Sequence, residues 1–512
     1  MSPMNPADPP PGPESGPLED ILAAKKAKVA ELRARGLDPY PPRSRKTHSC
    51  AEVNRLGETL AASEHGRETV ACAGRLLQLR DMGKSVFAHL EDGAGRCQLY
   101  FKKDALPEAG FLLVKKDLHA GDFIGVAGTV FKTKTGETTV AAASVALLAK
   151  ALRPLPEKWH GLKDVETRYR HRHLDLIANA GVREKFVQRS RIVSAVRRTL
   201  DALGFVEFET PVLLTQAGGA LARPFHTHHH ALGADLVLRI ATELYLKRLI
   251  IGGFEKVYEI GRIFRNEGID TRHNPEFTML EAYQAYSDYN GMAELCERVV
   301  AECAEALKVA QVSYGGKTVS LKPPFRRVHL PELWEKRCGE KIDNILEGKG
   351  FNKKGLLALA GRHNVPVGDT TPDAKIFERI FDARILPLLD QLTFVFDHPA
   401  AITPLAKLKP GTQGLVERFE CFGGHEELAN AYTELNDPQD QRERFLEQAQ
   451  RREEGNEETE PLDEDFVRAL ECGMPPTGGI GLGIDRLAML LTGQPSIRDV
   501  ILFPTLKPEG HP

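Results

Sequence analysis

The sequence predicts an α+β protein with a small β-barrel near its N-terminus and a larger second domain of mixed helices and strands. Three observations lead to this prediction. Residues 67–150 carry short runs in which apolar and polar residues alternate, the pattern of half-buried strands. Residues 181–203 carry the apolar stripe of a long amphipathic helix. Two later segments, 264–283 and 418–434, each have the pattern of two strands joined by a loop.

Length and composition limit the number of domains and the kinds of partner that the chain can have. A chain of 512 residues is expected to form two or three domains, and its composition is that of an ordinary globular protein. The net charge of -3 gives no overall basic signal, so a nucleic-acid partner would need a local basic face. The eight cysteines contain no CxxC pair, which argues against a zinc ribbon or a disulfide framework and favours a reduced, cytoplasmic protein. No signal sequence or membrane-spanning run is evident.

Residues 1–66 have two parts. Residues 1–17 are rich in Pro, Gly and Ser and are expected to be a disordered tail. Residues 18–66 form a helical segment, which begins at Pro17 and carries a basic face off its apolar stripe. That face is interpreted as solvated, with contact to nucleic-acid phosphates as the alternative.

Residues 67–150 predict a barrel of the OB type with five strands. The expected strands are Val70–Leu76, Ser85–Leu90, Cys97–Phe101, Phe123–Val126 and Thr138–Ala142. Strand alternation places Val86, Ala88 and Leu90 in the core, so that Phe87 points outward. The same reasoning points Gln98 outward. An outward aromatic ring beside an amide is typical of a surface that stacks and reads unpaired bases. Arg80 is a weaker candidate for this surface.

Residues 151–180 are interpreted as a basic linker before the larger domain, which covers 181–510. Two prolines stiffen this linker, and its arginines either lie under a nucleic-acid backbone or hold two domains together. A helix over 181–203 and a strand over 205–210 open the larger domain. Residues 325–390 are interpreted as a mainly helical insertion without assignable chemistry. The acidic run at 453–460 is expected to be a solvated loop.

The segment 264–283 predicts a platform for a phosphorylated nucleotide and an amino-bearing substrate. Arg265 and Glu267 share one face of the first strand, and Phe277, Glu281 and Tyr283 share one face of the second. Arginine suits two-pronged contact with phosphate or carboxylate, and an aromatic ring suits a stacked base. A surface hairpin in which Arg265 pairs with Glu267 is the plainer alternative.

The segment 418–434 supplies acidic groups. Glu420 and Glu427 are candidates for holding divalent cations, because Mg²⁺ prefers a few carboxylates together with substrate phosphate oxygens. Asn430, Tyr432 and Glu434 point the same way along a strand. Regular alternation places Glu427 on the opposite face from Glu434, so a bulge or turn has to reorient one of them. The histidines at 226–230 are not expected to bind a metal, because no acidic or cysteine ligand lies close in the sequence.

Three segments together resemble the motifs of class II aminoacyl-tRNA synthetases. FRNEGIDTRHNPEF resembles motif 2, the helix, strand and proline over 181–211 resemble motif 1, and GIGLGIDR at 479–486 resembles motif 3. The resemblance implies an antiparallel sheet flanked by helices and a homodimer formed through motif 1. The barrel resembles the anticodon-binding domain of the class IIb enzymes.

Within class IIb, the segments GGALARPFHTHHH and ECFGGHEELANAYTELND resemble the lysyl enzymes. In this chain Ala429, Ala431, Tyr432 and Thr433 stand where common bacterial versions have Gly, Gly, Phe and Ser. The resemblance implies catalytic roles for Arg265 and Arg486. Its implied ATP-binding residues are Arg265, Glu267, His273, Asn274, Phe277, Glu420 and Arg486. Its implied lysine-binding residues are Gly219, Glu243, Glu281, Tyr283, Asn430, Tyr432 and Glu434. Metal binding by Glu420 and Glu427, and anticodon binding by Phe87, Gln98 and Arg80, complete the set.

The activity that the resemblance implies is lysine–tRNA ligation in the cytoplasm. Lysine reacts with ATP, in the presence of several Mg²⁺ ions, and the lysyl group passes to the 3′ end of tRNA(Lys). Two alternatives are a related enzyme that attaches an amino acid to a protein and a non-catalytic RNA-binding paralogue. The base-reading barrel argues against the first, because base reading serves no purpose on a protein substrate.

Overall fold

The computed structural model describes residues 17–155, 162–179, 181–453 and 462–509. The chain separates into two compact units, Met1–Lys163 and Asp164–Pro512. The predicted disordered tail lies outside the described residues up to residue 16, and so does the acidic run from residue 454. Among the described residues, no helix combines the length and the apolar character needed to cross a membrane.

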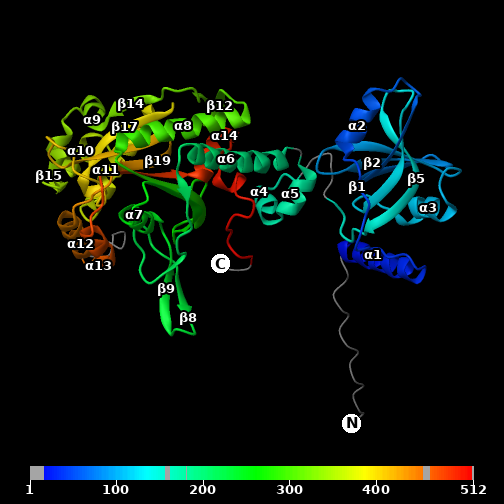
Figure 1. The fold of residues 1–512 in the computed structure, drawn as a ribbon, viewed down its shortest axis with the longest axis horizontal. Helices are drawn as coiled ribbons and strands as arrows, with labels where there is room; N and C mark the ends of the chain where they lie inside the picture. Colours follow the sequence, from blue (N-terminus) through cyan, green and yellow to red (C-terminus); the bar gives the residue numbers. More distant parts are fainter. Residues whose placement is uncertain (1–16, 156–161, 180, 454–461, 510–512) are drawn as a thin grey trace, which may run out of the picture. The chain divides into compact units, whose positions relative to one another are not determined.

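The first unit is built on a closed barrel of five strands (Figure 1). Its strands are β1 (His65–Asp81), β2 (Ser85–Glu91), β3 (Arg96–Lys102), β4 (Phe123–Lys132) and β5 (Thr138–Ala149), in the order β1-β2-β3-β5-β4. Each of the five predicted strands falls within one of them. A short helix α3 (Glu108–Leu112) and a π-helical turn (Leu113–Asp117) lie between β3 and β4. The prediction of an OB-type barrel is confirmed.

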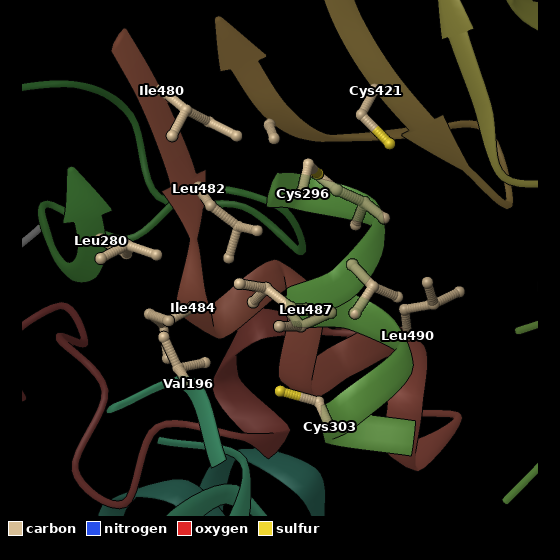
Figure 2. Close-up of a cluster of buried hydrophobic side chains, with 14 of the residues drawn as sticks. Val196, Leu280, Cys296, Cys303, Cys421, Ile480, Leu482, Ile484, Leu487 and Leu490 are labelled. Atoms are coloured by element: carbon tan, nitrogen blue, oxygen red, sulfur yellow. The ribbon is translucent and has the colours of Figure 1, made fainter. Parts of the chain in front are cut away.

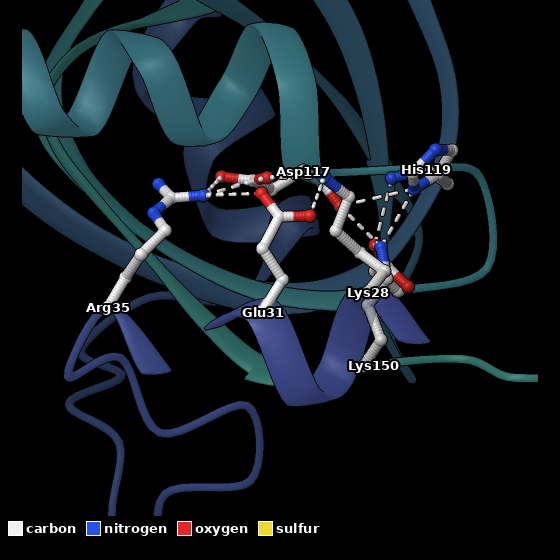
Figure 3. A network of polar contacts seen from close by, with 7 residues as sticks. Lys28, Glu31, Arg35, Asp117, His119 and Lys150 are labelled. Atoms are coloured by element: carbon white, nitrogen blue, oxygen red, sulfur yellow. Dashed lines mark hydrogen bonds and ion pairs between the residues drawn. The ribbon is translucent and has the colours of Figure 1, made fainter. Parts of the chain in front are cut away.

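Two helices precede the barrel, α1 (Pro17–Ala34) and α2 (Cys50–Glu58). Buried polar contacts dock α1 on the barrel, as Figure 3 shows. The Asp117 carboxylate is fully buried, accepts a hydrogen bond of 2.9 Å from Arg35 and lies 3.2 Å from the Lys28 ammonium. Lys28 of α1 and Arg35, which directly follows the helix, therefore hold α1 in place, whereas Lys26 and Arg33 bear exposed side chains.

The second unit contains a sheet of eight strands in the order β14-β17-β18-β19-β20-β11-β10-β6. These strands are β6 (Val206–Glu207), β10 (Lys256–Phe264), β11 (Glu276–Ala285), β14 (Arg326–His329), β17 (Thr393–Pro399), β18 (Leu415–Gly423), β19 (Glu426–Thr433) and β20 (Thr477–Gly483). The pairs β10–β6 and β14–β17 are parallel, and the other pairs are antiparallel. The sheet is thus largely antiparallel, as expected.

One face of this sheet is apolar and forms the hydrophobic core of the unit together with the helices that cover it. Helices α6 (Val182–Ala202), α8 (Tyr289–Leu307) and α14 (Ile484–Thr492) pack on it. Figure 2 shows Leu280, Ile480 and Leu482 of the strands converging with Cys296 and Leu487 of the helices. Because side chains alternate along a strand, the residues between these apolar positions must point to the other face.

The other elements of the second unit surround the sheet. The further helices are α4 (Val165–Arg170), α5 (Arg172–Ala178), α7 (Glu243–Ile251), α9 (Leu330–Cys338), α10 (Lys353–Arg362), α11 (Asp373–Arg384), α12 (Pro438–Glu453) and α13 (Glu464–Glu471). Small sheets join β7 (Leu213–Leu214), β9 (Ala234–Leu238) and β8 (His226–His229), then β12 (Gln311–Tyr314) and β13 (Lys317–Ser320), and β15 (Leu346–Glu347) and β16 (Gly350–Phe351). The 325–390 segment forms its own apolar cluster around Trp334 and Phe377.

The segment predicted as a linker, 151–180, is structured in its second half. Helices α4 and α5 belong to the second unit. The Arg172 side chain is buried, and it donates to Asp175 at 2.6 Å and to the carbonyl of Leu502 at 2.9 Å. The second unit therefore begins before the predicted residue 181, and two of the segment's charges stabilise it from within.

Candidate active site

The polar face of the sheet forms one wall of a cavity of about 1290 Å³. The cavity is lined by every residue that the sequence proposed for the nucleotide, the amino acid and the metal. These residues are Gly219, Glu243, Arg265, Glu267, His273, Asn274, Phe277, Glu281, Tyr283, Glu420, Glu427, Asn430, Tyr432, Glu434 and Arg486. The strands bring them together because β11, β20, β19 and β18 are neighbours, although they lie far apart in the sequence.

A β-bulge in β19 turns the Glu427 side chain to the face of the sheet that lines the cavity. Cys421 of β18 pairs with Ala429, but the next residue, Phe422, pairs with Glu427, so Leu428 is an extra residue. Leu428 and Ala429 are both buried in the core although they are consecutive. Such an extra residue shifts the alternation of a strand by one position. Glu427 therefore lines the same cavity as Glu434.

One end of the cavity holds a buried pair of carboxylates, Glu243 and Glu434. The Lys247 ammonium donates to Glu243 Oε1 and to Glu434 Oε2, both at 2.7 Å. The Tyr432 hydroxyl donates to Glu243 Oε2 at 2.6 Å. Glu434 Oε1 is buried and has no hydrogen-bond partner among the described residues. This end therefore has one open carboxylate oxygen, which suits a single added ammonium group.

Burial and neighbouring charges shift the pKa values of the ionisable side chains at this end of the cavity. Burial raises the pKa of Glu434 to about 8, although the charge of Lys247 opposes the rise. Burial also raises the pKa of Glu281 to about 7, with the nearby charge of Glu243 as a second cause. Burial would lower the pKa of Lys247, but the two carboxylates outweigh it and leave that pKa raised. Lys247 therefore keeps its charge, whereas Glu434 and Glu281 take up protons near neutral pH.

Glu281 lies beside this end and is held by its neighbours. Its carboxylate accepts from the backbone amide of Thr242 and from the Tyr283 hydroxyl, both at 3.2 Å. Gly219 has a left-handed backbone with φ of +84°, and a Cβ there would lie 3.1 Å from the Cβ of Glu243. A side chain at this position would therefore crowd the acidic end.

Arg265, Phe277 and Arg486 gather at the other end. Arg265 lies with its guanidinium 5.2 Å from the centre of the Phe277 ring, a cation–π arrangement. Arg486 donates to the carbonyl of Glu427 at 2.9 Å and lies 3.3 Å from its carboxylate. The prediction that Arg265 and Glu267 lie on a strand is wrong, because β10 ends at Phe264. Both residues nevertheless line the cavity from the loop that follows.

Asn274 and His273 are held by the loop itself. The Asn274 amide donates to the carbonyl of Glu276 at 2.6 Å, and its oxygen accepts from the amide of Thr505 at 3.2 Å. The side chain of Asn274 is thus engaged in joining the loop to the C-terminal segment. His273 lies 2.9 Å from the carboxylate of Asp270, on an exposed part of the same loop.

Glu420 and Glu427 are each held by one arginine. Glu420 accepts from Arg418 at 2.5 Å, and Glu427 lies beside Arg486. Burial raises the pKa of Glu420, while the charge of Arg418 acts in the opposite direction. Among the described residues, no cluster of three metal-ligating side chains occurs, so a cation here would need ligands from a substrate. The histidines of β8 are exposed and belong to no such cluster either.

Three features of the site were missed from the sequence. Lys247 follows Glu243 by one helical turn, a spacing typical of an ion pair, and this signal was available. Arg418 alternates with Glu420 and bonds Asn430 at 2.9 Å. Helix α11 of the insertion places Glu378 and Asp382 on the cavity wall, which contradicts the expectation that this segment carries no part of the site. The spacing of Glu378 and Asp382 in the sequence does not indicate that they reach the cavity.

The barrel surface follows the predicted parity. Val86, Ala88 and Leu90 are buried, and Phe87 is half-buried beside Tyr100, with ring centres 4.8 Å apart. The Gln98 amide donates to Glu137 at 2.6 Å and accepts from Thr139 at 2.8 Å. Arg80 is exposed and pairs with Phe87 across β1 and β2. Two rings, an amide and a guanidinium therefore share one outer face of β1, β2 and β3.

Comparison with known proteins identifies both units. Residues 164–507 match the model of class II tRNA synthetases for aspartate, lysine and asparagine, and residues 70–148 match the OB-fold nucleic acid binding domain. The chain is 50% identical over 498 residues to a lysine–tRNA ligase of Enterococcus faecalis, which covers 96% of this chain and 98% of that protein. It is 48% identical to that of Bacillus subtilis over 493 residues, covering 96% and 98%, and 47% identical to that of Dehalococcoides mccartyi over 494 residues, with the same coverage. The chain therefore belongs to the class II aminoacyl-tRNA synthetases of the aspartate, lysine and asparagine group, and within it to the lysine–tRNA ligases.

Proposed function

We propose that this chain activates L-lysine with ATP and transfers the lysyl group to the 3′ end of tRNA(Lys). The observation that carries the proposal for lysine is the charge of the acidic end. Glu243 and Glu434 share one buried cation, Lys247, so this pair carries an excess negative charge when both carboxylates are ionised, and Glu281 adds a further carboxylate beside them. Lysine supplies two ammonium groups that compensate this excess, whereas an aspartate side chain would add to it.

The two ends of the cavity support the two steps of the reaction. The lysine carboxylate attacks the α-phosphorus of ATP, pyrophosphate leaves, and lysyl-adenylate forms. The 3′ hydroxyl of the tRNA then attacks the lysyl carbonyl, and AMP leaves. The protein supplies no nucleophile, so its work is to place the reactants and to stabilise charge.

We assign the amino-acid contacts to the acidic end. The carboxylate of Glu281 receives the α-ammonium, and Glu434 with Glu243 receives the side-chain ammonium beside Tyr283. Asn430, Tyr432 and Gly219 complete the wall, with Asn430 toward the substrate carboxylate. Arg265 bridges that carboxylate and the α-phosphate, because a guanidinium bonds two oxygens at once.

We assign the nucleotide to the end lined by Phe277 and Arg486. The base lies between this ring and this guanidinium, and Glu267 and His273 contact the rest of ATP. Asn274 contributes by fixing the loop, since its side chain is already bonded to backbone.

Glu420 and Glu427 fit Mg²⁺. Both carboxylates line the cavity, and Mg²⁺ binds through one or two carboxylates and substrate phosphates instead of a complete protein cage. Bound ions would neutralise charge on the ATP phosphates. Arg418 and Arg486 hold the two carboxylates in place for that purpose.

Further parts of the proposal concern partners and location. The outer face with Phe87, Gln98 and Arg80 binds anticodon bases, since rings and amides stack on and bond unpaired bases. We also propose a homodimer through the motif 1 region around α6, and action in the cytoplasm.

The test is ATP–pyrophosphate exchange with a panel of amino acids. Lysine should support exchange strongly, and arginine, ornithine, aspartate and asparagine should support it weakly or not at all. Exchange that is equal with aspartate, or absent with every amino acid, would refute the assignment.

A further inference from the structure

The chain contains a lysine of its own behind the acidic end of the cavity. Lys247 has a fully buried side chain and is absent from the cavity wall, whereas the carboxylates that it bonds, Glu243 and Glu434, are both on the wall. Its ammonium also lies 5.2 Å from the ring centre of Phe466 on α13, a residue that does not line the cavity. Lys247 therefore does not occupy the place of a substrate.

We propose that Lys247 is a positioning residue that presents Glu434 Oε1 as the acceptor for the side-chain ammonium of the substrate. This inference rests on the proposed lysine specificity. Lys247 bonds one oxygen of each carboxylate at 2.7 Å, and Tyr432 bonds the second oxygen of Glu243. Glu434 Oε1 is then the one carboxylate oxygen of this pair without a partner among the described residues. The arrangement fixes both the number of open acceptors and their direction.

The number of open acceptors bears on selectivity. A primary ammonium can use one carboxylate oxygen, whereas a guanidinium needs two acceptors side by side for its fork. Two buried carboxylates without Lys247 would offer a wider and more negative acceptor. Lys247 thus favours an alkylammonium over a guanidinium and over a second cation in the same place.

The groups around Glu434 come from three elements. Helix α7 supplies Glu243 and Lys247, strand β11 supplies Glu281 and Tyr283, and strand β19 supplies Tyr432. Lys247 is the only cation among these groups. Its removal should therefore raise the pH that is needed to ionise the pair, because burial and the neighbouring carboxylates then act unopposed.

The experiment compares Lys247→Met with the wild type by lysine-dependent ATP–pyrophosphate exchange at several pH values. We expect the KM for lysine to rise about a hundredfold, as truncation of one partner of a buried charge pair usually weakens binding to that extent. The KM for ATP should change less than about threefold, and the pH below which the KM for lysine rises should move upward by about one unit. Ethylammonium should partly restore lysine binding to Lys247→Ala.

The matched control is Lys150→Met. Lys150 is another fully buried lysine, paired with Asp122 at 2.7 Å, but it lies in the barrel unit. Its loss should lower stability and leave the KM for lysine and its pH profile unchanged. If Lys247→Met is not recovered folded, Lys247→Gln is measured in the same way.

Two results would overturn the inference. One is a folded Lys247 variant whose KM for lysine is within threefold of the wild type. The other is an equal rise of both KM values with an unmoved pH profile, which indicates a structural role only. Loss of lysine-dependent exchange in the wild type itself would instead refute the proposed function.

Discussion

The substitution Gly479→Ala tests the acidic end with a single methyl group. A Cβ at Gly479 would lie 1.9 Å from Glu434 Oε1 and 2.6 Å from Cε1 of Tyr283. Ordinary contacts of a Cβ begin near 3.4 Å, so the carboxylate must retreat by well over an ångström. The backbone of Gly479 is outside the left-handed region, so alanine is compatible with the strand and the overlap is the sole difficulty.

The size of the effect follows from the contacts that the retreat breaks. Moving the Glu434 carboxylate stretches its bond of 2.7 Å to Lys247 and removes the open oxygen from its position. Disturbing a buried, hydrogen-bonded charge pair costs about 2–5 kcal/mol. At about 1.4 kcal/mol for each factor of ten, this corresponds to a rise of roughly 30-fold to 4000-fold in the KM for lysine.

Gly481→Ala is the matched control, because this glycine is two residues along the same strand and faces the same way. A Cβ there would meet its nearest atom, Sδ of Met279, at 3.7 Å, which is an ordinary contact. The assay is pyrophosphate exchange with lysine and ATP varied separately. A KM for lysine in Gly479→Ala within threefold of that of Gly481→Ala, in proteins of equal stability, would contradict the reasoning.

Three further predictions concern the rest of the site. Glu434→Gln should abolish lysine-dependent exchange and keep ATP binding, and calorimetry with ATP alone checks the second part; equal exchange in the variant removes Glu434 from its role. Phe87→Ala should weaken tRNA charging by one stacked base, about 1–3 kcal/mol or 5-fold to 150-fold in the KM for tRNA, and spare exchange; normal tRNA kinetics would count against Phe87. Lysine affinity should fall as the pH drops below about 8, and more steeply below about 7, because Glu434 and Glu281 then become protonated and lose the charge that receives an ammonium. A lysine affinity that stays constant between pH 8 and 6, measured by calorimetry, would show that these carboxylates do not receive it.

Much of the fold followed from local patterns. The five barrel strands and their inward residues were predictable because alternation in a small barrel has one buried face, as Val86, Ala88 and Leu90 show. Helix α6 was predictable from its apolar stripe. The strand end at Phe264 was not, because Arg265 and Glu267 alternate as a strand would while the chain has already left the sheet.

The site was predictable as a set of residues but not as a network. Motif resemblance named the cavity-lining side chains, and the sheet order explains how they meet. The partner of Glu243 and Glu434 was missed, because a lysine on a predicted helix is ordinarily placed in solvent. The contribution of α11 was missed because Glu378 and Asp382 reach the cavity only through the tertiary packing of the insertion.

The extra residue in β19 has a consequence for which changes this strand tolerates. Glu427 and Glu434 are separated by an odd number of positions, and they serve one cavity only because Leu428 resets the phase between them. Deleting one residue here would leave the composition nearly intact, yet it would turn either Glu427 or the acidic end with Glu434 into the hydrophobic interior. The number of residues in this strand is therefore more tightly constrained than the identity of the extra residue, Leu428.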